Sequence, residues 1–272
     1  GGKGANQAVA AARLGASARF FGRVGRDEFA AAVRGALTAH GLDAADLLED
    51  YEAATSLALI MIGAGGENAI VQAPGANRTV GLVDVERASP TIAAAKAVLL
   101  QLEIPLETTL LAARRARRAG ATTILDPAPA PPDGLPGSVF MAVDIVTPNE
   151  VEAETYAGFR PTDADSGVAA ARRLVDLGAP TAIVTMGGAG CAWAREDGAA
   201  GFQPPFDVAT IDTVAAGDCF NGALAVALVE GGPFEQAVRF AAAAGALATT
   251  RSGAAAAAPM RAEVEALLMA QP

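Results

Sequence analysis

Short apolar runs that end at Gly, Pro or Asp alternate with longer segments rich in Ala and Leu along this 272-residue chain. Such alternation is typical of a parallel sheet that helices cover on both faces. Strands are expected at Ala18–Val24, Leu57–Ile62, Ala69–Gln72, Ala97–Leu102, Thr122–Leu125, Asp144–Val146 and Ala182–Thr185. Helices are expected at Asn6–Leu14, Phe29–Ala39, Leu106–Ala119, Glu150–Tyr156, Gly167–Leu177, Ala216–Glu230, Phe234–Ala248 and Met260–Met269. The pattern therefore predicts an α/β fold.

One segment, 55–79, departs from this alternation. Two apolar runs flank the glycine-rich stretch 63–68, and Pro74-Gly75 follows the second run. Two strands joined by such a turn form an antiparallel hairpin, so we expect a flap beside the sheet. The proline-rich stretch 127–136 directly follows a strand and is expected to be a loop at the carboxyl edge of the sheet.

The segment 212–223 is chemically the most informative. Small residues at Ala215, Ala216 and Gly217 precede an apolar helix, and the free N–H groups and dipole of a helix N-terminus favour an anion. Asp218 would lie in the first turn, where its carboxylate could act as a base beside a phosphate. Asp is also a common helix cap, and the local pattern supports both interpretations equally.

Residues 1–8 form a second turn of small residues that enters a helix, but their spacing is not that of a Walker A loop. Most such glycine turns are structural. Here Lys3 and Asn6 place two polar side chains within one turn, which favours contact with a ligand.

Two further segments follow predicted strands, at the edge where doubly wound sheets bind their ligands. The stretch 185–190 could approach a nucleotide closely or form an ordinary turn. Asn149 and Glu152, three residues apart, would share a helix face and could orient a hydrated Mg²⁺. The alternative is that the acidic residues here only complement the helix dipole.

Composition disfavours several classes of function. The net charge of −10 opposes binding to the phosphates of nucleic acids. His40 is the only histidine, which excludes a His-based triad or a two-histidine metal site within one chain, and its place before Gly41 suggests a helix end. Cys191 and Cys219 are too few for a disulfide framework and are expected to be free thiols.

No membrane span is expected either. The uncharged stretch 177–194 is long enough to cross a bilayer, but its glycines and Pro180 predict a buried strand and a turn. Because no charged-then-apolar signal peptide is recognisable, the expected location is the cytoplasm.

Taken together, these segments resemble the ribokinase-like (PfkB-type) carbohydrate kinase family. The first family signature is similar to residues 1–15, GGKGANQAVAAARLG, and the second to residues 212–222, DTVAAGDCFNG. QLE at 101–103, DPAPA at 126–130, TPNE at 147–150 and TMG at 185–187 follow in the family's order. The resemblance implies a three-layer α/β/α fold with a mostly parallel central sheet and a small β lid, 55–79, within a single kinase domain, 1–272.

The resemblance also implies ATP-dependent phosphorylation of the 5-hydroxyl of D-ribose to give D-ribose 5-phosphate. Asp218 matches the family's general base, and the backbone N–H groups of Ala215, Ala216 and Gly217 match its anion hole. The sugar-binding positions match Gly2, Lys3, Asn6, Glu103 and Asp218. The nucleotide-binding positions match Asn149, Thr185, Met186, Gly187, Gly188, Ala189, Gly190 and Gly217. Glu152 completes an Asn-x-x-Glu pattern linked to Mg²⁺ and phosphate.

Members of this family also hold a monovalent cation, usually K⁺, beside the anion hole. The matching positions are Asp212, Val214, Ala248, Arg251 and Gly253, several of which act through backbone carbonyls. Ala257 stands where the family often has a serine, so the affinity or selectivity for the cation is expected to differ. The lid is also expected to carry a homodimer contact.

Family members carry a strand and a flap strand before the first signature, whereas this chain begins within it at Gly1. We therefore expect a fragment that lacks the N-terminal strand and part of the lid, with weak or no activity as residues 1–272. The nearest alternative is the same chemistry on fructose, a deoxyribose or adenosine. A non-catalytic sugar or nucleotide sensor is disfavoured by the retained Asp218. A dinucleotide-dependent oxidoreductase is disfavoured because no Gly-x-Gly-x-x-Gly follows an early strand.

Overall fold

The computed structural model describes residues 2–62 and 68–272, and of residues 60–62 and 68–70 the backbone alone. The helices are α1 (Lys3–Arg13), α2 (Glu28–Ala39), α3 (Leu82–Ala94), α4 (Leu106–Arg118), α5 (Gly137–Phe140), α6 (Glu150–Ala157), α7 (Ala164–Asp176), α8 (Ala216–Glu230), α9 (Phe234–Ala248) and α10 (Arg261–Ala270). The strands are β1 (Gly22–Val24), β2 (Leu47–Glu49), β3 (Leu57–Ile62), β4 (Asn68–Ala73), β5 (Ala97–Leu100), β6 (Thr122–Leu125), β7 (Ile145–Val146), β8 (Thr181–Thr185), β9 (Cys191–Arg195) and β10 (Ala200–Gln203).

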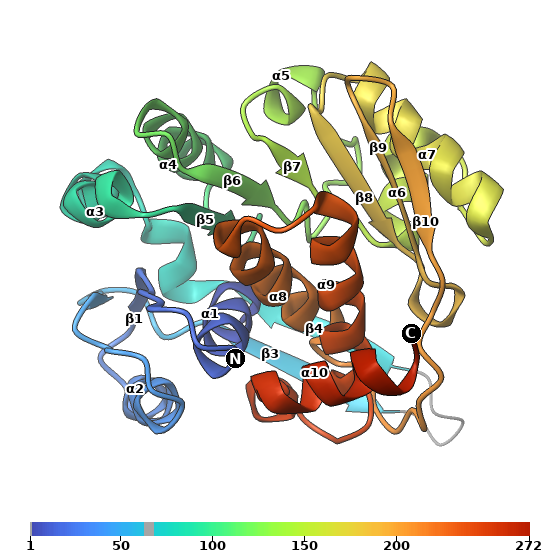
Figure 1. The fold of residues 1–272 in the computed structure, drawn as a ribbon. Helices are drawn as coiled ribbons and strands as arrows, with labels where there is room; N and C mark the ends of the chain where they lie inside the picture. The colour runs from blue at the N-terminus through green and yellow to red at the C-terminus, as the bar shows by residue number, and fades with distance from the viewer. Residues whose placement is uncertain (1, 63–67) are drawn as a thin grey trace.

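The central sheet has the strand order β10-β9-β8-β7-β6-β5 (Figure 1). Strands β5 to β8 are parallel, whereas β9 pairs antiparallel with both β8 and β10. The mostly parallel central sheet that the family resemblance implies is therefore confirmed, whereas the parallel sheet expected from the alternation alone is wrong at one edge. There a tight turn after Thr185 reverses the chain, so that β9 pairs antiparallel with β8.

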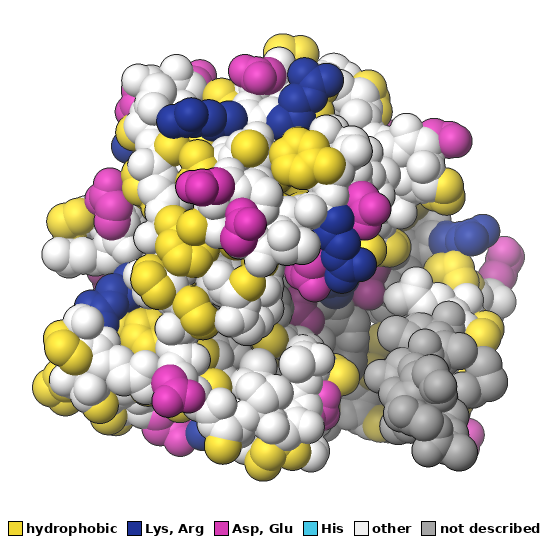
Figure 2. All heavy atoms as spheres, turned by 90° about the vertical axis from the view of Figure 1, so that its right-hand side faces the viewer, with side chains coloured by type: hydrophobic (Ala, Val, Ile, Leu, Met, Phe, Trp, Pro, Cys, Tyr) yellow, Lys and Arg dark blue, Asp and Glu magenta, His cyan; other side chains and the backbone are white. Residues whose placement is uncertain are grey.

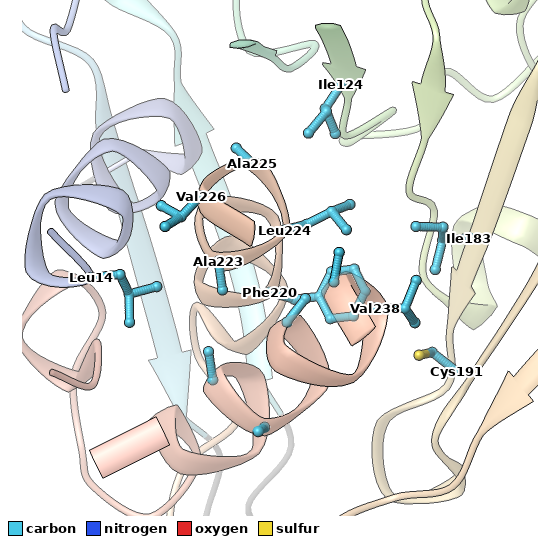
Figure 3. Packing of buried hydrophobic residues seen from close by; sticks show 14 of the residues in the cluster. Leu14, Ile124, Ile183, Cys191, Phe220, Ala223, Leu224, Ala225, Val226 and Val238 are labelled. Carbon is cyan, nitrogen blue, oxygen red and sulfur yellow. The ribbon is translucent and has the colours of Figure 1, made fainter. Parts of the chain in front are cut away.

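Alternating side chains give the sheet two apolar faces. Ile124, Ile145 and Ile183 pack with α8 and α9 on one face, and Figure 3 shows Phe220, Leu224 and Val238 directed toward Ile124 and Ile183. The next residue of each strand points to the opposite face, where Leu125, Val146 and Val184 pack with α4, α6 and α7. Because successive residues of a strand face opposite sides, these runs form the middle of three α/β/α layers.

The hairpin β3–β4 lies outside the central sheet, as expected, and its strands are antiparallel with Leu57 opposite Ala73. The predicted turn at 63–67 lies outside the described residues. Hydrogen bonds tie both ends of the hairpin to the body: Thr55 binds Asp27, and Asp50 accepts from both Thr79 and Arg23.

Three local expectations were wrong. The predicted strand 18–24 is a strand only over Gly22–Val24, where β1 pairs with β2 in a separate parallel pair. Helix α3 was not predicted, because it contains Pro90, which lacks an N–H for the helix ladder. Helix α1 begins at Lys3 rather than Asn6, with Gly2 as its N-cap at φ +89°.

Other expectations are confirmed. His40 is the C-cap of α2, and both cysteines are buried free thiols. None of the helices in 2–62 and 68–272 is both long and apolar enough to cross a membrane. On the face shown in Figure 2, acidic and basic side chains are intermixed with apolar ones over the described residues.

Candidate active site

Helices α1 and α8 pack closely enough to bring their polar residues together. A Cβ atom on Gly222 of α8 would lie only 2.7 Å from the Gln7 carbonyl oxygen of α1. Only glycine therefore allows this approach, which places Asn6 and Gln7 beside Asp218 in the first turn of α8.

The Asp218 carboxylate is buried and held by two side-chain amides. Asn6 Nδ2 donates to Asp218 Oδ2 at 2.8 Å, and Gln7 Nε2 donates to Asp218 Oδ1 at 3.1 Å. Burial raises the pKa of Asp218, while Lys3 and the two amide hydrogen bonds oppose that rise. The Asp218 carboxylate accepts from these side chains and not from the backbone N–H groups of α8, whose N-cap is Ala215. The helix-cap interpretation of Asp218 is therefore wrong.

The start of α8 has a strained backbone. Ala215 has φ +60° and is the non-glycine residue with positive φ among residues 2–62 and 68–272. Such a conformation persists only where the surroundings enforce it and is common at ligand-binding turns. The N–H of Ala216 donates to the Thr213 carbonyl oxygen at 3.3 Å, whereas the first N–H groups of a helix lack intrahelical partners and face outward from its end.

Lys3 and Glu103 lie next to this carboxylate. The Lys3 backbone N–H donates to Glu103 Oε2 at 2.8 Å, and Lys3 Nζ lies 3.3 Å from Asp126 Oδ2. Burial disfavours the charged ammonium, but Asp126, Asp218 and Glu152 outweigh it and raise the pKa of Lys3 well above its usual value. Gly2 is adjacent, since a Cβ there would lie 3.4 Å from Glu103 Oε2. All five predicted sugar-site residues therefore lie together.

One polar atom of this cluster has no partner. Among the described residues, Asn6 Oδ1 is the buried side-chain oxygen or nitrogen without a hydrogen bond. Unsatisfied buried acceptors are costly in a native protein, and they often mark a position that a ligand or water fills. A sugar hydroxyl that donates to Oδ1 would satisfy it.

Glu103 also faces the hairpin across a cavity of about 370 Å³. Ser56, Gln72 and Asn77 of the hairpin segment line the opposite side. Gly2, Asn6 and Glu103 border a larger hollow of about 1150 Å³ that continues between β1 and β5. The cluster is thus accessible to a small polar molecule.

Apart from Gly217, which lies in the first turn of α8, the predicted nucleotide residues gather at the carboxyl ends of β7 and β8, where Asn149 forms a bridge with Thr185. Asn149 is the N-cap of α6 and Glu152 is the third residue of that helix, so the two side chains lie next to each other as predicted, but each of them caps a backbone N–H of the helix start. Asn149 Oδ1 accepts from the Val151 and Glu152 N–H groups, and Glu152 Oε2 accepts from the Asn149 N–H at 2.9 Å. This reciprocal capping satisfies the helix start, and Glu152 Oε1 has no hydrogen-bond partner within residues 2–62 and 68–272.

The glycine turn after β8 is tight and partly exposed. Gly187 to Ala189 form one 3₁₀ turn, and the Met186 N–H donates to the Gly190 carbonyl at 2.8 Å. The Met186 side chain packs in the core, so only its backbone is available to a ligand. Gly187 and Gly188 are exposed and have open space at their Cα atoms.

The segments predicted to hold a cation meet beside α8. Asp212 accepts from the Val214 N–H at 3.0 Å and the Gly253 N–H at 3.1 Å, and these bonds lower the pKa of Asp212. The Arg251 guanidinium pairs with Glu263 at 2.7 Å, which leaves only its backbone carbonyl for a cation. Ala248 is buried nearby at the end of α9.

Sequence reasoning gave no site role to three residues of this network, Gln7, Gln101 and Asp126, although each lies in a motif that carries the family resemblance. Gln7 is fully buried, and its Oε1 accepts from Gln101 Nε2 at 2.5 Å. Asp126 is 4% exposed and accepts from Gln7 Nε2 at 2.9 Å. Adjacent amide residues in an otherwise apolar helix, and an Asp at the end of a buried strand, were the available signals.

Comparison with known proteins identifies the family. A model of the pfkB family carbohydrate kinase matches residues 1–261. The chain belongs to this family.

Individual members are similar over nearly the whole chain. This PfkB-family chain is 40% identical to a ribokinase of Haemophilus influenzae over 97% of its own length and 85% of that protein. It is 36% identical to a deoxyribokinase of Salmonella typhi over 93% of the chain and 82% of that protein. The structure of Arabidopsis thaliana ribokinase complexed with ribose and ATP matches with a TM-score of 0.88 and 32% identity, over 98% of this chain and 87% of that one. The three-layer fold with a mostly parallel sheet is thus a family feature.

Proposed function

We propose that the protein is a ribokinase, which transfers the γ-phosphoryl group of ATP to the 5-hydroxyl of D-ribose to give D-ribose 5-phosphate. The observation that carries the proposal is the Asp218 carboxylate, buried at the N-terminus of α8 and held by Asn6 and Gln7. The 40% identity to a ribokinase over most of the chain supports the choice of sugar. We treat residues 1–272 as one kinase domain with 55–79 as its lid.

In this mechanism, Asp218 accepts the proton of the attacking hydroxyl. Its partners donate to the carboxylate and so favour the ionised form, which a base needs. Asn6 Oδ1, which lacks a partner, accepts a hydrogen bond from a sugar hydroxyl. Glu103 accepts from another hydroxyl through an oxygen not bound to the Lys3 N–H.

Phosphoryl transfer depends on positioning and on stabilisation of charge. The N–H groups of Ala215 and Gly217, with the dipole of α8, stabilise the negative charge of the transferring group. The Ala216 N–H, which donates to the Thr213 carbonyl oxygen at 3.3 Å, would join them by exchanging that long bond for the phosphoryl group. The Lys3 ammonium lies in the same region and adds positive charge. ATP would lie along the carboxyl ends of β7 and β8, against Asn149 and the backbone of 185–190.

The residues present fit the two cations that the family implies. Mg²⁺ prefers oxygen ligands and is often held by one carboxylate together with substrate phosphates and water. The available Glu152 Oε1 provides such a ligand, and Mg²⁺ would neutralise phosphate charge there. K⁺ would be held by Asp212 and by backbone carbonyls of Val214, Ala248, Arg251 and Gly253, an all-oxygen donor set, and would fix the loop that precedes α8.

The choice of sugar is tested by ADP release from ATP with ribose, 2-deoxyribose, fructose and adenosine, using the protein in its natural full length. Ribose is expected to give the highest kcat/KM. A preference for 2-deoxyribose is the second candidate, because a deoxyribokinase is 36% identical. Measurable ATP binding without turnover on any of the four would instead indicate a sensor.

A matched variant tests the sugar contact itself. Asn6→Leu removes Oδ1 and is expected to raise the ribose KM by about 10-fold or more, as for a lost buried hydrogen bond. Asn77→Ser, on the hairpin side of the cavity, is the comparison. An unchanged KM for Asn6→Leu would contradict the assignment of Oδ1 to the sugar.

We also propose that the hairpin joins two copies of the chain. Leu59 and Val71 lie opposite each other in β3 and β4 and are 63% and 53% exposed. An exposed apolar pair on a small sheet is an effective contact surface. Leu59→Glu is expected to shift the molar mass by light scattering from dimer to monomer, and an unchanged mass would contradict this contact. The buried free thiols fit a reducing compartment, and the cytoplasm is the proposed site of action.

A further inference from the structure

Asp126 is a buried carboxylate that the mechanism above does not use. It follows β6, is 4% exposed, and its N–H donates to the Leu100 carbonyl oxygen at 2.9 Å, which fixes its backbone to β5. Its Oδ2 accepts from Gln7 Nε2 at 2.9 Å and lies 3.3 Å from Lys3 Nζ. A buried carboxylate is costly unless it is paired, and both of its partners also border Asp218.

Gln7 links the two carboxylates. The two hydrogens of Nε2 point to Asp126 Oδ2 at 2.9 Å and to Asp218 Oδ1 at 3.1 Å. Gln7 Oε1 accepts from Gln101 Nε2, so the amide cannot flip without losing all three bonds. The position of Asp218 Oδ1 therefore depends on a chain of contacts that ends at Asp126.

Lys3 is the second link. Its ammonium lies against Asp126 and close enough to Asp218 for both carboxylates to affect its charge. If Asp126 were neutral, the ammonium would be free to move toward Asp218 and pair with it. A directly paired carboxylate is a weaker base, because the positive charge stabilises its ionised form.

We propose that Asp126 is a positioning residue of the phosphoryl-transfer site: it anchors Lys3 away from Asp218 and, through Gln7, orients the Asp218 carboxylate toward the sugar hydroxyl. This proposal deepens the proposed function and rests on Asp218 as the base. Asp126 itself has no role in contacting the sugar or the phosphate.

The charged groups around Asp126 come from several elements. Lys3 of α1, Asp218 of α8 and Glu152 of α6 act on it directly, and Glu103 lies beyond Lys3. Burial raises the pKa of Asp126 to about 7, Lys3 opposes the rise, and Asp218 and Glu152 add to it. The Asp126 carboxylate is thus charged above neutral pH and holds Lys3 there, whereas below neutral pH it is protonated and the contact is weakened. We therefore expect kcat to rise with pH as Asp126 ionises.

The kinetic test compares Asp126→Asn with the wild type from pH 5.5 to 9. At pH 8.5 the variant is expected to lose about 10-fold or more in kcat, the scale of a misoriented base. It should also lack the rise near neutral pH that the wild type shows. Asp144→Asn, at the opposite end of β6 and β7 where Asp144 binds Thr123, is the control and should keep the wild-type profile. A wild-type kcat or profile in Asp126→Asn overturns the proposal, as does an equal loss at every pH.

A second measurement does not depend on turnover. Residues 1–272 contain two lysines, Lys3 and the exposed Lys96, so ¹³C-lysine labelling resolves each Cε signal in a pH titration. Asp126→Asn is expected to move the Lys3 Cε signal and change its titration, since the ammonium loses the Asp126 charge and moves toward Asp218, without moving the Lys96 signal. An unchanged Lys3 titration refutes the claim that Asp126 holds the Lys3 ammonium, even if no sugar is phosphorylated. The absence of wild-type turnover refutes only the proposed function.

Gln7→Met tests the Gln7 amide separately from the Lys3 ammonium. It also provides a test if Asp126→Asn does not fold. It keeps both carboxylates and the Lys3 contact but removes the amide. The expected result is a lower kcat with the Lys3 titration unchanged. An unchanged kcat in Gln7→Met overturns the amide link.

Discussion

The substitution Gly222→Ala is expected to move apart α1 and α8, the two helices that carry Asn6, Gln7 and Asp218. The added Cβ would lie 2.7 Å from the Gln7 carbonyl oxygen and 2.8 Å from Ala10 Cβ, so α1 and α8 must move apart. Overpacking of this kind costs about 1–3 kcal/mol, while a helical Gly→Ala change recovers about 0.5–1 kcal/mol. The net loss then spans about 0–2.5 kcal/mol. Because the added atom would lie 2.7 to 3.0 Å from three atoms of α1, we expect the upper part of this range, about 1–2.5 kcal/mol, or a Tm lower by about 2–10 °C.

The loss of kcat in Gly222→Ala should be larger than the loss of folding free energy alone would cause. Asn6 and Gln7 hold Asp218 across this contact, and a displacement near 1 Å can cost about 100-fold in rate. The kcat for ribose is therefore expected to fall by about 10-fold or more at a temperature where circular dichroism shows the variant folded.

Gly35→Ala is the matched control. Gly35 lies in the exposed part of α2 and would meet no atom within 4 Å. This change should raise the stability by about 0.5–1 kcal/mol and leave kcat unchanged. The reasoning is refuted if Gly222→Ala melts at or above the wild-type temperature, or if it keeps the wild-type kcat.

Three further outcomes are expected. Burial raises the pKa of Cys191 and Cys219 to about 12, so neither thiol should react with Ellman's reagent at pH 8 until the protein is denatured; rapid labelling would contradict this. The raised pKa of Asp126, about 7 against an ordinary 3.8, means that the folded state binds the extra proton and loses stability as pH rises between these values. The Tm of Asp126→Asn relative to wild type should therefore increase from pH 4 to pH 7, and a constant difference would refute it. Asp212→Asn should raise the K⁺ concentration for half-maximal activity by about 10-fold or more, and an unchanged K⁺ dependence would argue against that site.

The sheet and its covering helices follow from the local pattern. Apolar residues alternate between two buried faces at Ile124 and Leu125, and the predicted bounds of α8 and α9 agree with the structure. These elements are long or strongly patterned. Helix α3 was missed because Pro90 argues against a helix that packing against α4 nevertheless stabilises.

The site was only partly predictable. Asp218, Lys3 and Asn6 were singled out because glycine-rich turns precede them, whereas Gln7 and Asp126 acquire a role only through contacts between residues more than 100 positions apart. The positive φ of Ala215 likewise depends on tertiary structure, since Ala has no intrinsic preference for it. Asn149 and Glu152 illustrate the reverse case, because their spacing of three residues already predicts that they lie next to each other at the start of a helix.

The most direct test of the account is the single-turnover rate of ribose phosphorylation by Asp218→Asn. The substitution keeps the shape of the side chain and removes the base. We expect the rate to fall by about 10²–10⁴-fold, with the ribose Kd within a few-fold of wild type and the product identified as ribose 5-phosphate by ³¹P NMR. A rate within tenfold of wild type would contradict the role of Asp218 as the base.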